Sequence, residues 1–138
     1  MANSIMSERI TQGIRIRAVA EYLPEHSNPE EDRFLFSYHI TISNEGTLSA
    51  KLISRHWIII NSFGETQEVR GPGVIGETPL LNPGKKFEYT SFCPLDTNFG
   101  TMEGSYQMER EEGEVFEAEI GRFYLATTAP SFSSEKKG

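Results

Sequence analysis

The sequence has 138 residues, of which 37% are hydrophobic, and carries a formal net charge of −7 at neutral pH. This length fits a single domain built around one core. The acidic balance and the scattered positions of the basic residues disfavour a nucleic-acid-binding protein, because phosphate backbones attract clustered lysines and arginines. The longest purely apolar run, Trp57 to Ile60, is far shorter than the about 20 residues that cross a bilayer, so no membrane segment is expected.

The two ends of the chain show little apolar periodicity. We therefore predict a flexible N-terminus over residues 1–10, one folded domain over residues 11–126 and a flexible C-terminal tail over residues 127–138. The first residues lack the basic stretch and apolar segment of a secretory signal. Cys93 is the only cysteine, so an internal disulfide is excluded. Both features favour a cytoplasmic protein.

Apolar and polar residues alternate through the first half of the domain, which is the period of strands with one buried face. One such run extends from Ile14 to Tyr22, and a second covers residues 34–42. A turn sequence, Asn-Glu-Gly at residues 44–46, separates them from a third run over residues 51–63. The third run has apolar residues of both parities, which indicates a central strand or a twisted one, and its tryptophan is expected to be buried.

The second half of the domain continues the alternation. The sequence Asn-Pro-Gly at residues 82–84 predicts a tight turn, because proline presets φ and glycine accepts the left-handed conformation that follows. Alternating residues mark strands over 87–93 and 102–108. The acidic cluster that comes next, from Glu109 to Glu114 with Gly113, is predicted to form a solvated hairpin loop.

The last predicted strand changes parity between Ile120 and Phe123, which a β-bulge near Gly121 would explain. No stretch of ten or more residues repeats apolar positions at helical spacing. Seven or more short strands with turn sequences between them therefore predict an all-β protein that folds as a β-sandwich.

A series of short motifs occurs between residues 55 and 108. They are RHWII (55–59), VRGPGVIGETP (69–79), LNPG (81–84), FEYTS (87–91) and GTMEGSYQM (100–108). In these motifs, and in their order and spacing, the chain resembles the ApaG domain family. With the flanking strands, the resemblance covers about residues 12–126.

The resemblance implies an immunoglobulin-like, fibronectin type III-like β-sandwich with no established enzymatic activity, and we expect no enzyme here. For bacterial members it implies an association with cobalt and magnesium resistance or efflux. For eukaryotic relatives it implies a protein-binding role. Pyrophosphate binding at the glycine-rich loop has also been proposed for the family.

The glycine-rich loop, residues 71–76, matches the string Gly-x-Gly-x-x-Gly. Pro79 and Pro83 follow so closely that no helix can begin after it. A dinucleotide site of the Rossmann type is therefore rejected. An anion-binding nest of backbone amides does not need a helix. Its candidate residues are Arg70, Gly71, Gly73, Val74, Ile75 and Gly76. The other reading, which we favour, is that the glycines serve tight turns and close packing.

The remaining reactive residues do not form a recognisable catalytic or metal-binding pattern. His26, His39 and His56 lack the spacing of known metal motifs, and we read them as partly exposed residues. Cys93 has no basic neighbour to lower its thiol pKa and is expected in the core. No metal and no cofactor are predicted.

Together these features favour a non-catalytic binding module. Its expected partner is an unidentified protein, bound through an exposed strand edge or through the glycine-rich loop. The alternative is a small-ligand module that holds pyrophosphate or a nucleotide diphosphate at residues 71–76.

Overall fold

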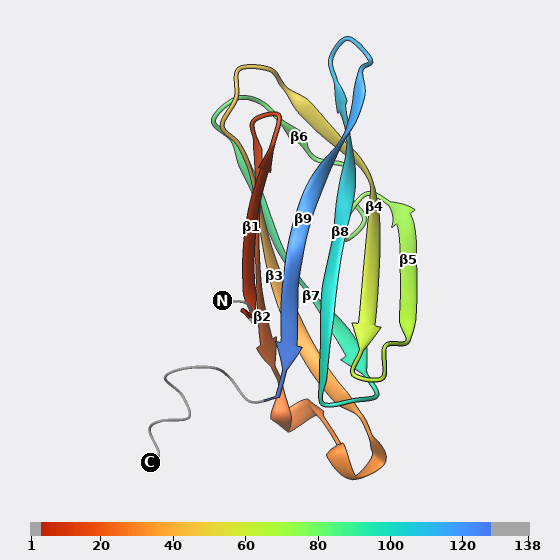
Figure 1. The fold of residues 1–138 in the computed structure, drawn as a ribbon. Helices are drawn as coiled ribbons and strands as arrows, with labels where there is room; N and C mark the ends of the chain where they lie inside the picture. Colours follow the sequence, from red (N-terminus) through yellow and green to blue (C-terminus); the bar gives the residue numbers. More distant parts are fainter. Residues whose placement is uncertain (1–3, 128–138) are drawn as a thin grey trace.

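The computed structural model describes residues 4–127, which form nine strands and two single-turn 3-10 helices (Figure 1). The strands are β1 (Met6–Thr11), β2 (Ile14–Tyr22), β3 (Phe34–Asn44), β4 (Ala50–Asn61), β5 (Thr66–Pro72), β6 (Leu80–Leu81), β7 (Lys86–Leu95), β8 (Phe99–Arg110) and β9 (Val115–Ala126). The short helices η1 (Pro24–His26) and η2 (Pro29–Glu31) lie between β2 and β3. No helix among the described residues is long and apolar enough to cross a membrane.

The strands form two antiparallel sheets. One has the order β1-β2-β3-β7, and the other has the order β5-β4-β8-β9, with the two-residue β6 paired to the start of β4. The two sheets face each other and enclose one hydrophobic core. The expected all-β, immunoglobulin-like sandwich of seven or more antiparallel strands is confirmed.

The core follows the alternation of the sequence. The residues of even number are buried from Ile14 to Ala20 on β2 and from Phe36 to Asn44 on β3, and the residues between them are not. Trp57 on β4 is 2% exposed and packs edge-on against Tyr38 of the opposite sheet, with ring centroids 5.2 Å apart. The predicted burial of the tryptophan is confirmed. Such aromatic contacts between sheets stabilise the sandwich beyond the area that they bury.

The predicted turns and bulge also occur. Gly84 has φ 88° in the turn before β7, and Gly113 has φ 101° in the acidic hairpin between β8 and β9. On β9, the register against β8 shifts by one residue between Ile120 and Phe123, so a bulge lies at Gly121. The bulge keeps both apolar residues in the core.

The N-terminus differs from the prediction. Residues 6–10, expected to be loose, belong to β1, which pairs with β2 from Met6 to Thr11. The sequence Met-Ser-Glu-Arg-Ile-Thr shows no clear period of two because β1 is an edge strand without a buried residue. Of the predicted C-terminal tail, residues 128–138 lie outside the described part of the chain.

The order of the strands gives the sandwich two unlike flanks. On one flank β1 lies beside β9, as Figure 1 shows, and this is called the closed flank below. On the opposite flank β5 and β7 are the last strands of their sheets, and this is called the open flank.

Candidate functional site

The glycine-rich loop begins at the end of β5 and uses its first amides for its own fold. The amide of Gly73 donates to the carbonyl of Ile53 at 2.8 Å, and the amide of Val74 donates to the carbonyl of Glu77 at 2.9 Å. Ile75 and Gly76, with φ 40° and 81°, form the tip of the tight turn between Val74 and Glu77. Positive φ at both central residues is typical of a type I′ turn.

Arg55 of β4 binds the backbone of this loop. Its Nη1 donates to the carbonyl oxygens of Pro72 at 2.9 Å and Gly73 at 3.0 Å. A Cβ on Gly71 would lie 2.8 Å from Nη2 of the same guanidinium, so the glycine leaves room for it. The loop therefore turns two carbonyl oxygens, and not a set of amides, toward the Arg55 guanidinium.

The six candidate residues of the anion loop do not surround one point. Gly71 and Gly73 lie beside Arg55 at the end of β5, Val74 is buried, and Ile75 is 55% exposed at the tip. Arg70 is exposed, and its Nη2 lies 3.4 Å from Glu68 Oε1. Among loop residues 73–77, the amides of Ile75 and Gly76 donate to no protein acceptor. This geometry supports the structural reading of the glycines.

A cluster of hydroxyl groups lies between the sheets near Arg55. The hydroxyls of Tyr89 and Tyr106 form a hydrogen bond, and burial raises the pKa of both groups. Burial also raises the pKa of Tyr38. These phenols therefore remain protonated at neutral pH. The Tyr89 and Tyr106 hydroxyls hold each other in the core instead of supplying a base.

Cys93 is 3% exposed, as expected of a core residue. Burial raises the pKa of its thiol to about 12. At neutral pH the thiolate, which is the reactive form, is therefore scarce. The position on β7 suits packing better than nucleophilic chemistry.

The two strand histidines lie in different sheets and each joins an edge strand to its neighbour. His39 on β3 places Nε2 at 2.9 Å from Glu88 of β7, and His56 on β4 places Nε2 at 3.0 Å from Glu68 of β5. Each glutamate lies diagonally across the ladder from its histidine. Glu88 is opposite Thr41 and Glu68 is opposite Ile58, in each case two residues beyond the histidine. Within residues 4–127 no group of three or more potential ligands is arranged for a metal ion.

The free edge of β5 follows from the ladder with β4. The amide of Asn61 donates to the carbonyl of Glu65, and the amide of Gly73 donates to the carbonyl of Ile53. The residues of odd number in β5 therefore direct their backbone N–H and C=O toward β4. In an antiparallel ladder the intervening residues direct N–H and C=O away from the partner strand. Thr66, Glu68 and Arg70 therefore present both groups at the open flank, and Pro72 presents a carbonyl only.

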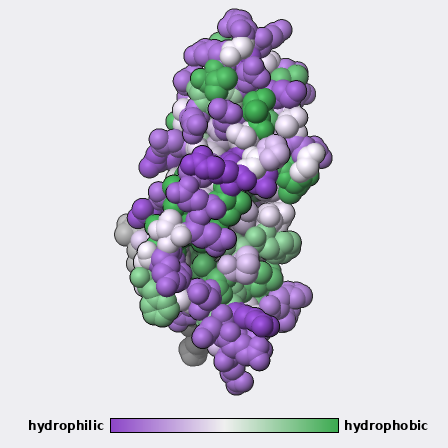
Figure 2. Space-filling view, turned by 90° about the vertical axis from the view of Figure 1, so that its right-hand side faces the viewer, coloured by the Kyte–Doolittle hydropathy of each residue, from purple (hydrophilic) through white to green (hydrophobic). Residues whose placement is uncertain are grey.

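The β7 edge is built in the same way. The amide of Asn44 donates to the carbonyl of Lys85, so the odd residues of β7 direct their backbone polar groups toward β3. The even residues, from Lys86 to Pro94, direct theirs outward. Pro94 ends this edge without an N–H. Figure 2 faces the β5 side of the molecule and shows apolar patches interrupted by polar residues.

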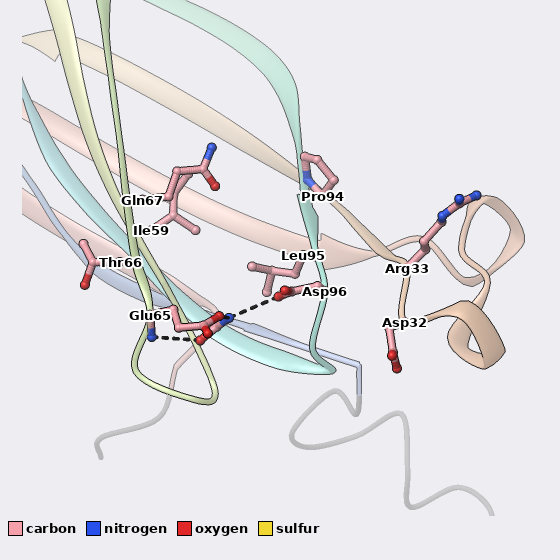
Figure 3. Close-up of a pocket in the computed structure, with 10 residues that line it drawn as sticks. Asp32, Arg33, Ile59, Glu65, Thr66, Gln67, Pro94, Leu95 and Asp96 are labelled. Atoms are coloured by element: carbon pink, nitrogen blue, oxygen red, sulfur yellow. Dashed lines mark hydrogen bonds between the residues drawn. The ribbon is translucent and has the colours of Figure 1, made fainter.

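A pocket of about 500 Å³ opens between the two free edges at one end of the open flank (Figure 3). We call it the flank pocket. It is lined by Asp32, Arg33, Ile59, Asn61, Glu65, Thr66, Gln67, Pro94, Leu95 and Asp96. Ile59 and Leu95 form an apolar floor, each 8% exposed, and carboxylates stand at the rim.

Residues 24–110 match the ApaG domain family (DUF525). A protein named ApaG from Aromatoleum aromaticum is 53% identical over 121 residues, which cover 88% of this chain and 95% of that protein. Another from Pseudomonas putida is 52% identical over 113 residues, which cover 82% of this chain and 90% of that protein. The chain belongs to the ApaG family.

Solved structures agree with the ApaG assignment. A crystal structure of an ApaA protein from Bordetella pertussis superposes with a TM-score of 0.81 at 42% identity, covering 94% of this chain and 99% of that one. The C-terminal domain of wzt superposes with a TM-score of 0.53 at 11% identity, covering 93% and 81% of the two chains. The latter likeness concerns the fold alone.

Two features of this ApaG chain are not predicted from the sequence. Arg55 belongs to the RHWII motif, and its parity with Trp57 and Ile59 places its charged side chain on the inner face of β4. That parity is the signal that could have revealed it. The flank pocket joins segments far apart in sequence, and no local pattern predicts such a meeting.

Proposed function

We propose that this chain is a non-catalytic ApaG-type binding module, and that a partner protein adds a strand to the free edge of β5. The observation that carries the proposal is the row of outward N–H and C=O groups on Thr66, Glu68 and Arg70. In strand addition, backbone hydrogen bonds provide affinity and neighbouring pockets select side chains. The β5 edge offers both, because the flank pocket lies beside Thr66.

The two other types of edge suit a partner less well. On the closed flank, side chains of β1 already occupy polar groups of β9: Ser7 Oγ donates to the carbonyl of Gly121 at 2.7 Å. On β7, the residue that lines the flank pocket and directs its backbone outward is Pro94, which has no N–H to donate. At the pocket, β5 alone provides both a donor and an acceptor.

The non-catalytic part of the proposal is supported by the buried, protonated state of Cys93 and the tyrosine cluster. We further propose that any link to cobalt or magnesium resistance operates through the partner protein in the cytoplasm. The separation of His39 and His56 onto different sheets supports this indirect route.

A proline substitution on β5 tests the proposal, because it removes one outward donor and leaves the ladder with β4 intact. Glu68→Pro deletes such an N–H, and Glu68→Ala is the matched control that keeps it. Thr90→Pro makes the equivalent change on β7. Circular dichroism and urea unfolding first establish that each variant keeps the fold.

Each variant is then used to capture proteins from a bacterial extract, and the captured proteins are quantified by mass spectrometry. Partners retained by the wild type, Glu68→Ala and Thr90→Pro but lost from Glu68→Pro are the expected result. Capture of the same partners by folded Glu68→Pro would contradict strand addition at β5.

A further inference from the structure

The flank pocket also indicates the chemistry of the partner, if the proposed function holds. We propose that the strand added to β5 belongs to a basic segment, and that one of its lysine or arginine side chains enters the flank pocket. The inference rests on the position of the pocket, its apolar floor and the charges at its rim.

The position of the pocket matches the geometry of an added strand. Successive side chains of a strand point to opposite faces of its sheet, so every second residue of a strand added to β5 would face the space between the sheets. Gln67 of β5 lies on that face and lines the pocket with Ile59 of β4. A side chain of the added strand level with Gln67 would therefore enter the pocket.

The carboxylates of Glu65 and Asp96 lie at the rim, accept hydrogen bonds from Asn61 and have no cationic partner in the described chain. Asn61 Nδ2 donates to Glu65 Oε1 at 2.7 Å and to Asp96 Oδ1 at 3.1 Å, which holds both groups beside the pocket (Figure 3). Within residues 4–127 neither carboxylate has an ion-pair partner. Arg33 points away from them and lies 3.5 Å from Glu31 instead.

A long basic side chain fits this combination better than a free metal ion or an acidic group. Lysine and arginine have an apolar stem, which can cover Ile59 and Leu95, and a charged end, which can reach Glu65 and Asp96. A metal ion would leave the apolar floor uncovered. The chain as a whole carries a charge of −7, which also attracts a basic segment and repels an acidic one.

The test uses random octapeptides displayed on phage and selected on the immobilised full chain. Peptides that bind are synthesised twice, with the selected lysine or arginine and with norleucine in its place. Their dissociation constants are measured by fluorescence anisotropy on four proteins: the wild type, Glu68→Pro, the double variant Glu65→Gln/Asp96→Asn, and Glu111→Gln/Glu112→Gln. The last variant removes the same charge from the distant acidic hairpin and serves as the control.

We expect lysine or arginine to be enriched at one peptide position. Replacement by norleucine should weaken binding about fivefold on the wild type and on the hairpin control. It should have no effect on Glu65→Gln/Asp96→Asn, in which the amide oxygens can still accept from Asn61. Glu68→Pro should weaken both peptides together, because it removes a backbone hydrogen bond that both share.

The other outcomes separate the two proposals. Peptides that need the Glu68 amide but show no preference for lysine or arginine would overturn the basic-segment inference and leave strand addition standing. Dissociation constants of both peptides that stay at the wild-type values in folded Glu68→Pro would overturn strand addition at β5, whether or not basic residues are preferred. Failure to recover any binding peptide would count against both.

Discussion

The two flanks of the sandwich differ in whether side chains cover the backbone polar groups of their edge strands. On the closed flank, Ser7 and Thr11 of β1 bond the backbone of β9, through the carbonyl of Gly121 and the amide of Glu119. On the open flank, the outward groups of Thr66, Glu68 and Arg70 face away from the protein. Side chains can thus cover the edge of a sheet in this fold, so an edge whose polar groups stay uncovered is a candidate for function.

The largest expected effect concerns the end of the closed flank, where Arg110 joins the β1–β2 turn to the β3–β4 loop. Its guanidinium is buried, stacks 4.5 Å above Phe116 and donates to the carbonyls of Gln12, Leu48 and Ser49. Arg110→Ala leaves these carbonyls without their donor and should lower the free energy of unfolding by about 3 kcal/mol. Urea denaturation measures the change.

Arg122→Ala is the control for that experiment, since Arg122 is exposed and pairs with Glu103 at the surface. Its unfolding midpoint should stay close to that of the wild type. Equal midpoints for Arg110→Ala and Arg122→Ala would show that the closed flank does not depend on the buried arginine.

A smaller effect is expected in the glycine-rich loop next to the open flank. Gly73 has φ 58°, and a Cβ there would collide with the carbonyl oxygen of Glu77, whereas a Cβ on Gly76, at φ 81°, meets open space. Gly73→Ala should cost about 2 kcal/mol of stability, and Gly76→Ala about 1 kcal/mol. Thermal unfolding compares them. A larger loss for Gly76→Ala would contradict the turn described here.

The smallest effect concerns the β7 edge at low pH. The hydrogen bond with His39, and then Lys86, lowers the pKa of Glu88 from its ordinary value of 4.5. A lowered pKa in the folded state adds stability above pH 4.5, and this is lost as the pH falls through the folded value. The difference in Tm between the wild type and Glu88→Gln should therefore shrink below pH 4.5.

Glu21→Gln is the control, because Glu21 on β2 forms no ion pair within the described chain. It should show no such change in the difference in Tm. A difference for Glu88→Gln that stays constant down to pH 3 would mean that the pair with His39 does not stabilise the edge.

Much of this fold could be predicted because burial follows a period of two. Trp57, the even residues of β2 and β3, and the bulge at Gly121 were all readable from the alternation. Strand β1 was not, because its side chains cover a flank and not the core, so its sequence lacks the period.

The candidate site was less predictable for a different reason. A glycine string shows that a loop turns sharply, but not which amides the turn consumes, and here Gly73 and Val74 donate within the protein. The flank pocket requires the register that brings Glu65 near Asp96, which pairwise sequence patterns do not contain.

Amide hydrogen exchange along β5, followed by NMR spectroscopy, tests the central claim most directly. In the free protein the amides of Thr66, Glu68 and Arg70 should exchange rapidly, while those of Gln67, Val69 and Gly71 are protected by β4. Addition of a selected octapeptide should protect the first three. Uniform protection in the free protein, or unchanged exchange at Glu68 with the peptide bound, would contradict an open and binding edge.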